Sequence, residues 1–245
     1  MLETNSHARH KNVFKRSVFM ILRRLRIWIA KNRLMISYRL LGRKINRNQW
    51  ARTQKNAGNW DLYDKLIEYS WHQTKTNFPV YFRGLKFCVE HCRGEVLEIG
   101  CGIGTMTKWI AQKELVTKVI AIDISPEAMG NMKERQIGKV WPVLMDMQRL
   151  NFERRHKFDT VMLCDVLEHI YPDEEKNMLI SLKTYIDENT HYIISTPIYW
   201  MDDPYHVRGF SKSEFKKHLR RYYGKPSTID YSVGYRQIAV GRFLI

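Results

Sequence analysis

The chain has 245 residues, of which 44% are hydrophobic and 27% charged, and its formal net charge is +16. This length and composition exclude a wholly disordered chain and provide for one α/β domain with an appendage. The four cysteines contain no C-x-x-C pair, so we expect reduced thiols in a cytosolic protein. A zinc site at Cys88 and Cys92, with His91 between them, is the weaker alternative.

Most of the positive charge belongs to an N-terminal extension. Residues 1–56 hold 15 basic residues and one acidic residue, whereas the rest of the chain holds 26 and 24. Residues 14–40 predict an amphipathic helix with apolar and basic faces. Arginines interrupt it too often for a membrane span or a cleaved signal peptide. The helix can contact an anionic membrane, bind RNA or another polyanion, or pack on the main domain.

A polar linker over residues 42–58 separates this extension from the main domain, so we divide the chain into residues 1–58 and 59–245. Helices are expected over residues 60–71 and 78–92. Residues 96–104, VLEIGCGIG, then predict a buried strand, a tight glycine turn and the start of a helix. Glu98 ends this strand, where a carboxylate packs poorly but suits the polar groups of a ligand.

The glycine spacing is G-x-G-x-G, with an acid two residues before the first glycine. Dinucleotide-binding domains instead space their glycines G-x-G-x-x-G. The turn resembles that of the class I methyltransferases, which use S-adenosylmethionine. The resemblance implies that this cofactor is bound through the turn residues Glu98, Gly100, Cys101, Gly102 and Gly104.

The next two strands also end in acidic residues. Asp123 ends the strand over residues 119–125 and follows Gly104 by 19 residues, the spacing expected of a carboxylate that binds a ribose diol. The third strand, residues 140–145, leads to Asp146, which in this family lies by the adenine amino group. The family pattern adds three further cofactor contacts: Ile124, Met147 and Cys164.

A fourth strand over residues 158–164 precedes the sequence DVLEHI, which is common in the family after the strand that faces the methyl-transfer site. Strands and helices alternate from residue 95 to 196, which predicts a Rossmann-like, doubly wound and mostly parallel sheet. A fifth strand, a basic helix and two late strands complete a seven-stranded sheet: residues 191–197, 211–222, 227–231 and 237–243. We expect Asn189 to supply a left-handed turn in place of the family's glycine.

Methyl transfer requires an oriented acceptor and often a base. The candidate bases are Asp165, His169 and His206. His206 lies on the loop after the fifth strand, residues 202–211, which resembles the corresponding loop of methyltransferases acting on quinone precursors and glycans. The alternative for Glu168 and His169 is that they begin the helix after the fourth strand and only brace neighbouring loops.

Some relatives, the ubiquinone-pathway O-methyltransferases and the small-RNA 2′-O-methyltransferases, bind a divalent cation. Their ligands are an acid, a second acid three residues later and the adjacent histidine. Their counterparts here are Asp165, Glu168, His169 and His206, whose donor types suit Mg²⁺, Mn²⁺ or Zn²⁺. This chain has Asp where those enzymes have Glu, and many relatives with the motif bind no metal. We therefore expect no metal and keep this set as the alternative.

The sequence thus favours transfer of a methyl group from S-adenosylmethionine to a small-molecule, lipid-linked or glycan acceptor, at oxygen. It suggests a cytoplasmic enzyme that can lie on the inner face of a membrane through residues 14–40. An RNA methyltransferase that holds its substrate with the extension is one alternative. An inactive cofactor-binding scaffold is another. Such a scaffold would be expected to have other residues in place of Glu98, Gly102 or Asp123, and this chain keeps all three. Neither the acceptor nor the oligomeric state is predicted.

Overall fold

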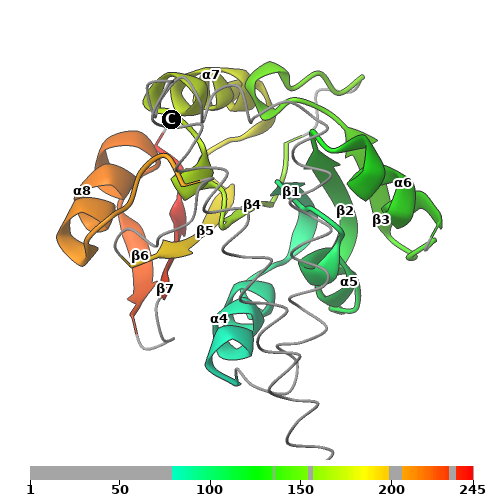
Figure 1. Cartoon of the computed structure of the whole chain (residues 1–245), viewed down its shortest axis with the longest axis horizontal. Helices are drawn as coiled ribbons and strands as arrows, with labels where there is room; N and C mark the ends of the chain where they lie inside the picture. Colours follow the sequence, from blue (N-terminus) through cyan, green and yellow to red (C-terminus); the bar gives the residue numbers. More distant parts are fainter. Residues whose placement is uncertain (1–78, 135, 154–156, 199–205, 232–235, 245) are drawn as a thin grey trace, which may run out of the picture. The chain divides into compact units, whose positions relative to one another are not determined.

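The computed structural model describes residues 79–244, except 135, 154–156, 199–205 and 232–235 (Figure 1). The basic extension, the linker, the division at residue 58 and the helix expected over residues 60–71 lie outside the described residues. None of the described helices is both long enough and apolar enough to cross a membrane.

A seven-stranded sheet forms the centre of the described domain, in the order β3-β2-β1-β4-β5-β7-β6. The first five strands are parallel, and β7 runs antiparallel to both β5 and β6. The strands are β1 (Gly94–Ile99), β2 (Val116–Asp123), β3 (Val140–Leu144), β4 (Thr160–Cys164), β5 (His191–Pro197), β6 (Pro226–Asp230) and β7 (Arg236–Arg242). This arrangement confirms the predicted Rossmann-like, mostly parallel sheet.

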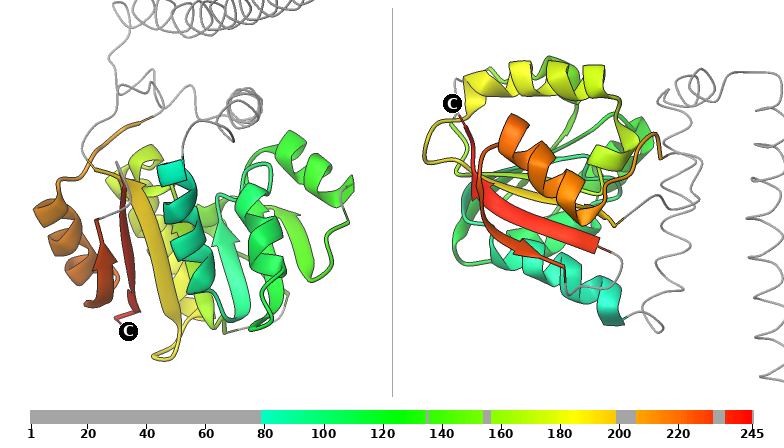
Figure 2. Two further views of the ribbon diagram at one scale, coloured as in Figure 1. Left: turned by 90° about the horizontal axis from the view of Figure 1, so that it is seen from below. Right: turned by 90° about the vertical axis from the view of Figure 1, so that its left-hand side faces the viewer.

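Helices cover both faces of the sheet (Figure 2). The described helices are α4 (Pro79–Glu90), α5 (Thr105–Ala111), α6 (Pro126–Glu134), α7 (Pro172–Leu182) and α8 (Lys212–Tyr222). Alternate side chains of a strand point to opposite faces. In β1, Val96 belongs to the core formed with α4, α5 and α6, whereas Leu97 belongs to the core formed with α7 and α8. Both side chains are fully buried, as a parallel strand covered on both faces requires.

The turn before β5 differs from the prediction. Asn189 is not among the described residues with a left-handed backbone, so that expectation is wrong. Instead, the Asp187 carboxylate accepts hydrogen bonds from the backbone N–H of Asn189 at 2.9 Å and of Thr190 at 3.1 Å. An Asp side chain that bonds the backbone two residues ahead stabilises a turn without glycine.

The residues after β4 also differ from the prediction, which had Glu168 and His169 beginning a helix. They lie in a short 3-10 turn, η2 (Leu167–His169), and α7 begins later, at Pro172. Proline suits the first helical position, and the Glu174 carboxylate accepts a hydrogen bond from the Tyr171 N–H at 2.7 Å. His169 is therefore held in a tight turn at the strand end.

Glu175 of α7 is buried and has three side-chain partners. Its carboxylate is 2.7 Å from an Arg208 guanidinium nitrogen, 2.8 Å from Nε2 of His218 and 2.7 Å from the Tyr223 hydroxyl. Burial alone would raise the pKa of Glu175, but the His218 hydrogen bond and the charges of Arg208 and His218 outweigh it, so the pKa is lowered. One carboxylate thus joins α7, α8 and the loop after β5.

We expect Glu175→Ala to lower the free energy of unfolding by about 3 kcal/mol, because the largely buried guanidinium of Arg208 would lose its partner. The folded-state pKa of Glu175 is lowered, so its contribution is complete above the ordinary carboxyl pKa and is lost as pH falls through the lowered value. Urea unfolding at neutral and acidic pH measures this, with the exposed neighbour Lys176→Ala as control. An equal loss of unfolding free energy at neutral and acidic pH would contradict stabilisation by the ionised Glu175 carboxylate.

Candidate functional site

The strand order reverses between β1 and β4, the two strands at the centre of the sheet. The chain passes from β1 to α5 on one face and from β4 to α7 on the other. The loops after these strands therefore diverge, and open α/β sheets bind their ligands in the crevice that results.

A cavity of about 270 Å³ lies at this point. Its lining comes from Leu85 of α4, from the ends of β1, β2 and β4 and from the segments that follow β1 to β4. Nine of the ten residues that the sequence suggested for a cofactor line it: Glu98, Gly100, Cys101, Gly102, Asp123, Ile124, Asp146, Met147 and Cys164. Gly104, the tenth, precedes the first residue of α5 and is not part of the lining. Residues far apart in the sequence are thus gathered around one space.

The glycine turn brings the main chain to the cavity wall. Gly100, Gly102 and Gly104 have φ values of 71°, 51° and 77°, a region that residues with a Cβ rarely adopt. The N–H groups of Gly100 and Cys101 both donate to the Ile122 carbonyl of β2, at 2.9 and 3.1 Å. A Cβ on Gly100 would lie 2.7 Å from the Val166 side chain. The turn therefore fits only with glycine at this position.

Asp123 fixes the same turn from the end of β2. Its carboxylate accepts hydrogen bonds from the Gly102 N–H at 2.8 Å and from the Ser125 N–H at 3.0 Å. The carboxylate is thereby oriented at the cavity wall, and the turn after β1 is tied to the end of β2.

Glu98 is the buried acid of the cavity, with 3% of its surface exposed. Its Oε2 has no hydrogen-bond partner among the described residues. Burial raises the pKa of Glu98 to about 8, the Thr107 hydroxyl opposes this rise, and the negative charge of Asp123 adds to it. A cation bound in the cavity would favour the ionised form of Glu98.

The segment after β3 closes another part of the cavity wall. Asp146 caps the short helix η1 (Met147–Arg149) by accepting a hydrogen bond from the Gln148 N–H at 2.9 Å. Ile124 and Met147 line the cavity as well, so an acid stands here among apolar side chains. Such a lining suits a flat heterocycle that carries an amino group.

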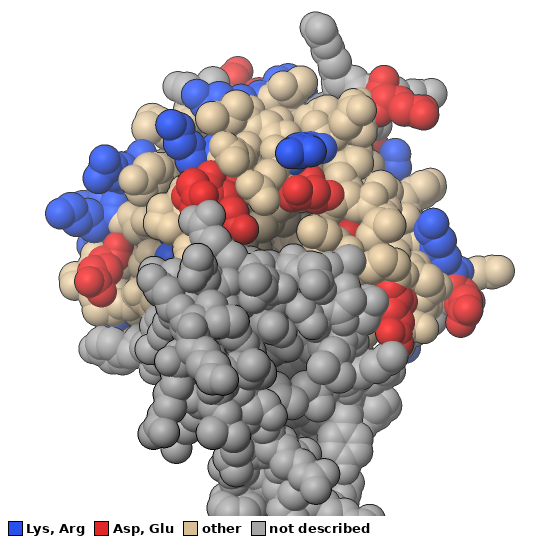
Figure 3. All heavy atoms as spheres, turned by 45° about the horizontal axis from the view of Figure 1, so that its top comes forward, with Lys and Arg blue, Asp and Glu red and all other residues tan. Residues whose placement is uncertain are grey.

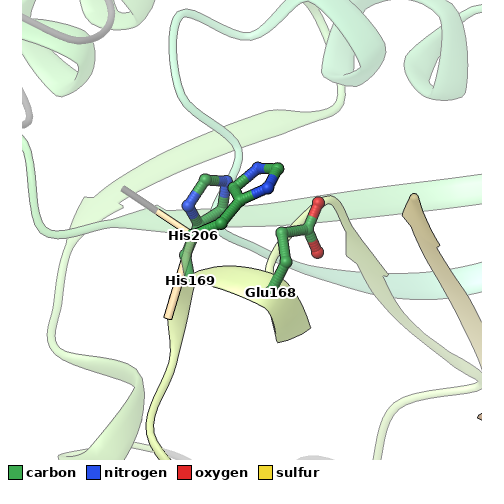
Figure 4. Close-up of side chains that lie close together, drawn as sticks. All are labelled: Glu168, His169 and His206. Atoms are coloured by element: carbon green, nitrogen blue, oxygen red, sulfur yellow. The ribbon is translucent and has the colours of Figure 1, made fainter. Parts of the chain in front are cut away.

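Three of the four side chains predicted for the acceptor end lie together beyond β4 and β5 (Figure 4). Ligand atoms of Glu168, His169 and His206 lie within 4.8 Å of one another, and all three residues are buried. The two imidazole rings meet edge to face with their centroids 4.8 Å apart. Glu168 also accepts a hydrogen bond from the Thr196 hydroxyl of β5 at 2.9 Å.

Two hydrogen bonds to backbone carbonyls hold this cluster in place. The Val207 N–H donates to the Glu168 carbonyl at 2.8 Å, and Nε of Arg208 donates to the Leu167 carbonyl at 2.7 Å. These bonds join the loop after β5 to the turn after β4. His169 lines the cavity, and His206 contacts His169 without being part of the lining.

Asp165, the remaining acid of the predicted metal set, is not part of this cluster. Its backbone is left-handed, with φ 56°, and its carboxylate pairs with the Arg236 guanidinium and accepts a hydrogen bond from the Ser195 hydroxyl at 3.2 Å. The four-residue set is corrected to Glu168, His169 and His206. One carboxylate and two imidazoles still fit a divalent cation such as Mn²⁺ or Zn²⁺ by donor type.

The cysteines do not favour the zinc alternative. Cys88 and Cys92 are both buried, and the Cys92 thiol donates to the Cys88 carbonyl. Burial raises the pKa of Cys92, with smaller contributions from Glu98 and Cys88. Because zinc binds the thiolate, a thiol in these surroundings is a poor ligand.

Comparison with known proteins finds similarity in the segment that supplies most of the cavity lining. A family model described as a methyltransferase domain matches residues 96–188. An N-methyltransferase of Papaver somniferum is 30% identical over 92 residues, which cover 36% of this chain and 24% of that protein. The chain thus spans about a quarter of the length of this curated relative.

Solved structures share the fold at low sequence identity. The 1,6-didemethyltoxoflavin N1-methyltransferase of Burkholderia thailandensis, with bound S-adenosylhomocysteine, has a TM-score of 0.55 and 20% identity, over 76% of this chain and 88% of that one. The glycopeptide N-methyltransferase MtfA, with S-adenosyl-L-methionine, has a TM-score of 0.54 and 12% identity, over 67% and 87%. Residues 96–188 thus match a methyltransferase domain model, and the described sheet shares its fold with these solved methyltransferases.

Proposed function

We propose that the protein transfers a methyl group from S-adenosylmethionine to an acceptor held beyond β4 and β5. The observation that supports this most strongly is the cavity at the β1/β4 crevice, which gathers nine of the ten residues suggested for the cofactor. The cofactor carries the reactive sulfonium methyl group, and the protein supplies binding and orientation. In this proposal Asp123 binds the ribose hydroxyls, Asp146 the adenine amino group, and Glu98 faces the positively charged end of the cofactor.

The acceptor end needs a group that removes a proton. His169 or His206 takes the proton from the acceptor hydroxyl as the new carbon–oxygen bond forms and the carbon–sulfur bond breaks, leaving S-adenosylhomocysteine. Asp165 is a less suitable base because its carboxylate is already bound to Arg236. We propose a small-molecule, lipid-linked or glycan acceptor methylated at oxygen.

A nitrogen acceptor is the second candidate, because the similar proteins are named as N-methyltransferases. An RNA acceptor and an inactive cofactor-binding scaffold are the remaining alternatives. Liquid chromatography and mass spectrometry of labelled methyl transfer into pooled lipid, glycan, amine and RNA extracts distinguishes these classes. Absence of transfer into every extract would favour the scaffold.

For the extension, we propose peripheral contact of residues 14–40 with the cytoplasmic face of an anionic membrane, by charge attraction and burial of the apolar face. Co-sedimentation of the full chain with anionic and neutral vesicles tests this, and equal binding to both would contradict it.

We expect Asp123→Ala to weaken cofactor binding by about 1.5–3 kcal/mol, because it removes hydrogen bonds to a charged group. The variant also loses the bond to the Gly102 N–H, so the glycine turn loosens. Isothermal titration with S-adenosylmethionine and S-adenosylhomocysteine measures the effect, with the exposed residue Glu114→Ala of the same domain as control. Lack of binding by the wild type at millimolar cofactor would contradict the proposed function.

Glu98 gives cofactor affinity a pH dependence. In the free protein its pKa is about 8, so below that pH the bound cation must displace a proton. We expect affinity to fall by roughly tenfold for each pH unit below 8 and to level off above it. Calorimetry at neutral pH in buffers of different ionisation enthalpy should show release of about one proton, and Glu98→Gln should abolish it. If Glu98→Gln released as many protons as the wild type, Glu98 would not be the source of the released proton.

We expect His206→Ala or His169→Ala to reduce the methyl-transfer rate by about 10²–10⁴-fold while cofactor affinity stays within threefold or so, because a general base acts on the acceptor. Single-turnover rates and cofactor titrations measure the two quantities. The matched control is His91→Ala, because His91 belongs neither to the cavity lining nor to the cluster of Glu168, His169 and His206. If chelation abolishes wild-type turnover and Mn²⁺ restores it, the cluster instead holds a metal. Unchanged rates in both variants would refute both roles.

A further inference from the structure

Helix α8 has one buried face and one strongly basic face. Phe215 and Leu219 are fully buried against the sheet. Residues 212–225 contain one acidic residue, Glu214, whose carboxylate accepts a hydrogen bond from the Ser211 N–H at the helix start. They also contain six exposed basic residues: Lys212, Lys216, Lys217, Arg220, Arg221 and Lys225. We call these six residues the α8 basic face.

This concentration of charge is specific to one side of the domain. Residues 57–245 hold 26 basic and 24 acidic residues, so without residues 212–225 they hold 20 and 23. Basic side chains gather on the α8 side in Figure 3. Within the described part of the chain, none of the six forms an ion pair with another residue. Their charge is therefore available to a partner.

Two large apolar side chains are exposed at the end of the same helix. Tyr222 is 43% exposed and Leu244 is 66% exposed. The Leu244 N–H donates to the Tyr223 carbonyl at 2.6 Å, which brings the last strand's end against the end of α8. The guanidinium of Arg221 lies 5.2 Å from the centroid of the Tyr222 ring. Basic and exposed apolar groups thus lie side by side.

We propose that the α8 basic face, with Tyr222 and Leu244, docks on the surface of an anionic lipid bilayer. Lysine and arginine are attracted to acidic headgroups, while tyrosine and leucine enter the boundary between headgroups and acyl chains. A nucleic-acid phosphate backbone would use the charges but would leave Leu244 exposed to water. The proposal concerns a surface and does not depend on methyl transfer.

The fold links this surface to the acceptor end of the site. His206 lies six residues before Lys212, the first residue of α8. Arg208 of the intervening loop and His218 of α8 both bind the Glu175 carboxylate, so loop and helix are held as one unit. Docking through α8 is therefore linked through Glu175 to the loop that carries His206.

The test uses the full chain with four glutamines replacing cations of the α8 basic face: Lys216→Gln, Lys217→Gln, Arg220→Gln and Arg221→Gln. The matched control replaces four exposed cations on other elements: Lys108→Gln, Lys133→Gln, Arg149→Gln and Lys176→Gln. Affinity is measured for phosphatidylcholine vesicles with and without phosphatidylserine. We expect the α8 variant to bind anionic vesicles at least about tenfold more weakly than the control variant. Thermal melting verifies that both variants fold.

A second readout separates α8 from the N-terminal extension, which carries charge of its own. An environment-sensitive fluorophore is attached at Lys217→Cys or, as control, at Lys133→Cys in the full chain. Quenching by brominated lipids at position 217 but not at 133 supports docking through α8. No quenching at 217 on bound vesicles overturns the proposal, whatever the affinities. Equal affinity of the two glutamine variants for anionic vesicles, with weaker RNA-oligonucleotide binding by the α8 variant alone, would assign the face to nucleic acid and also overturn it.

Discussion

The left-handed glycines after β1 set the geometry of the cofactor side. Because Gly100 lies against Val166 and its N–H bonds to the Ile122 carbonyl, the turn is pressed between the ends of β2 and β4. The Asp123 carboxylate then holds Gly102 from the neighbouring strand. This part of the cavity wall is therefore main chain, held by a backbone hydrogen bond and by the Asp123 carboxylate, and the acids at the strand ends stand at fixed positions around it.

The acceptor side depends on a different kind of interaction, a buried charge network. Glu175 binds Arg208 and His218, and Arg208 reaches the Leu167 carbonyl beside Glu168 and His169. The position of His206 thus follows from contacts between α7, α8 and two loops. A network of this kind positions the histidine cluster without the local glycine and acid motifs that mark the cofactor side. It also links the cluster to the basic surface of α8.

Similarity to known proteins follows the same division. The family model covers residues 96–188, which include the cofactor side and the turn after β4 but not His206 or α8. His206, α8 and the basic extension all lie outside that match. The acceptor is for this reason the part of the function that the shared domain determines least.

The sequence by itself determined the elements of the sheet and the turn after β1. Apolar strands that alternate with helices, a G-x-G-x-G turn and acids at strand ends are all local patterns. The left-handed residue expected at Asn189 was wrong, because an Asp187 side chain made the same turn by another local route. Only the tertiary structure decided that Asp165 pairs with Arg236 and leaves the cluster of Glu168, His169 and His206. It alone also revealed the raised pKa of Glu98 and the Glu175 network. Burial and contacts between residues far apart in the chain leave no periodic signal in a sequence.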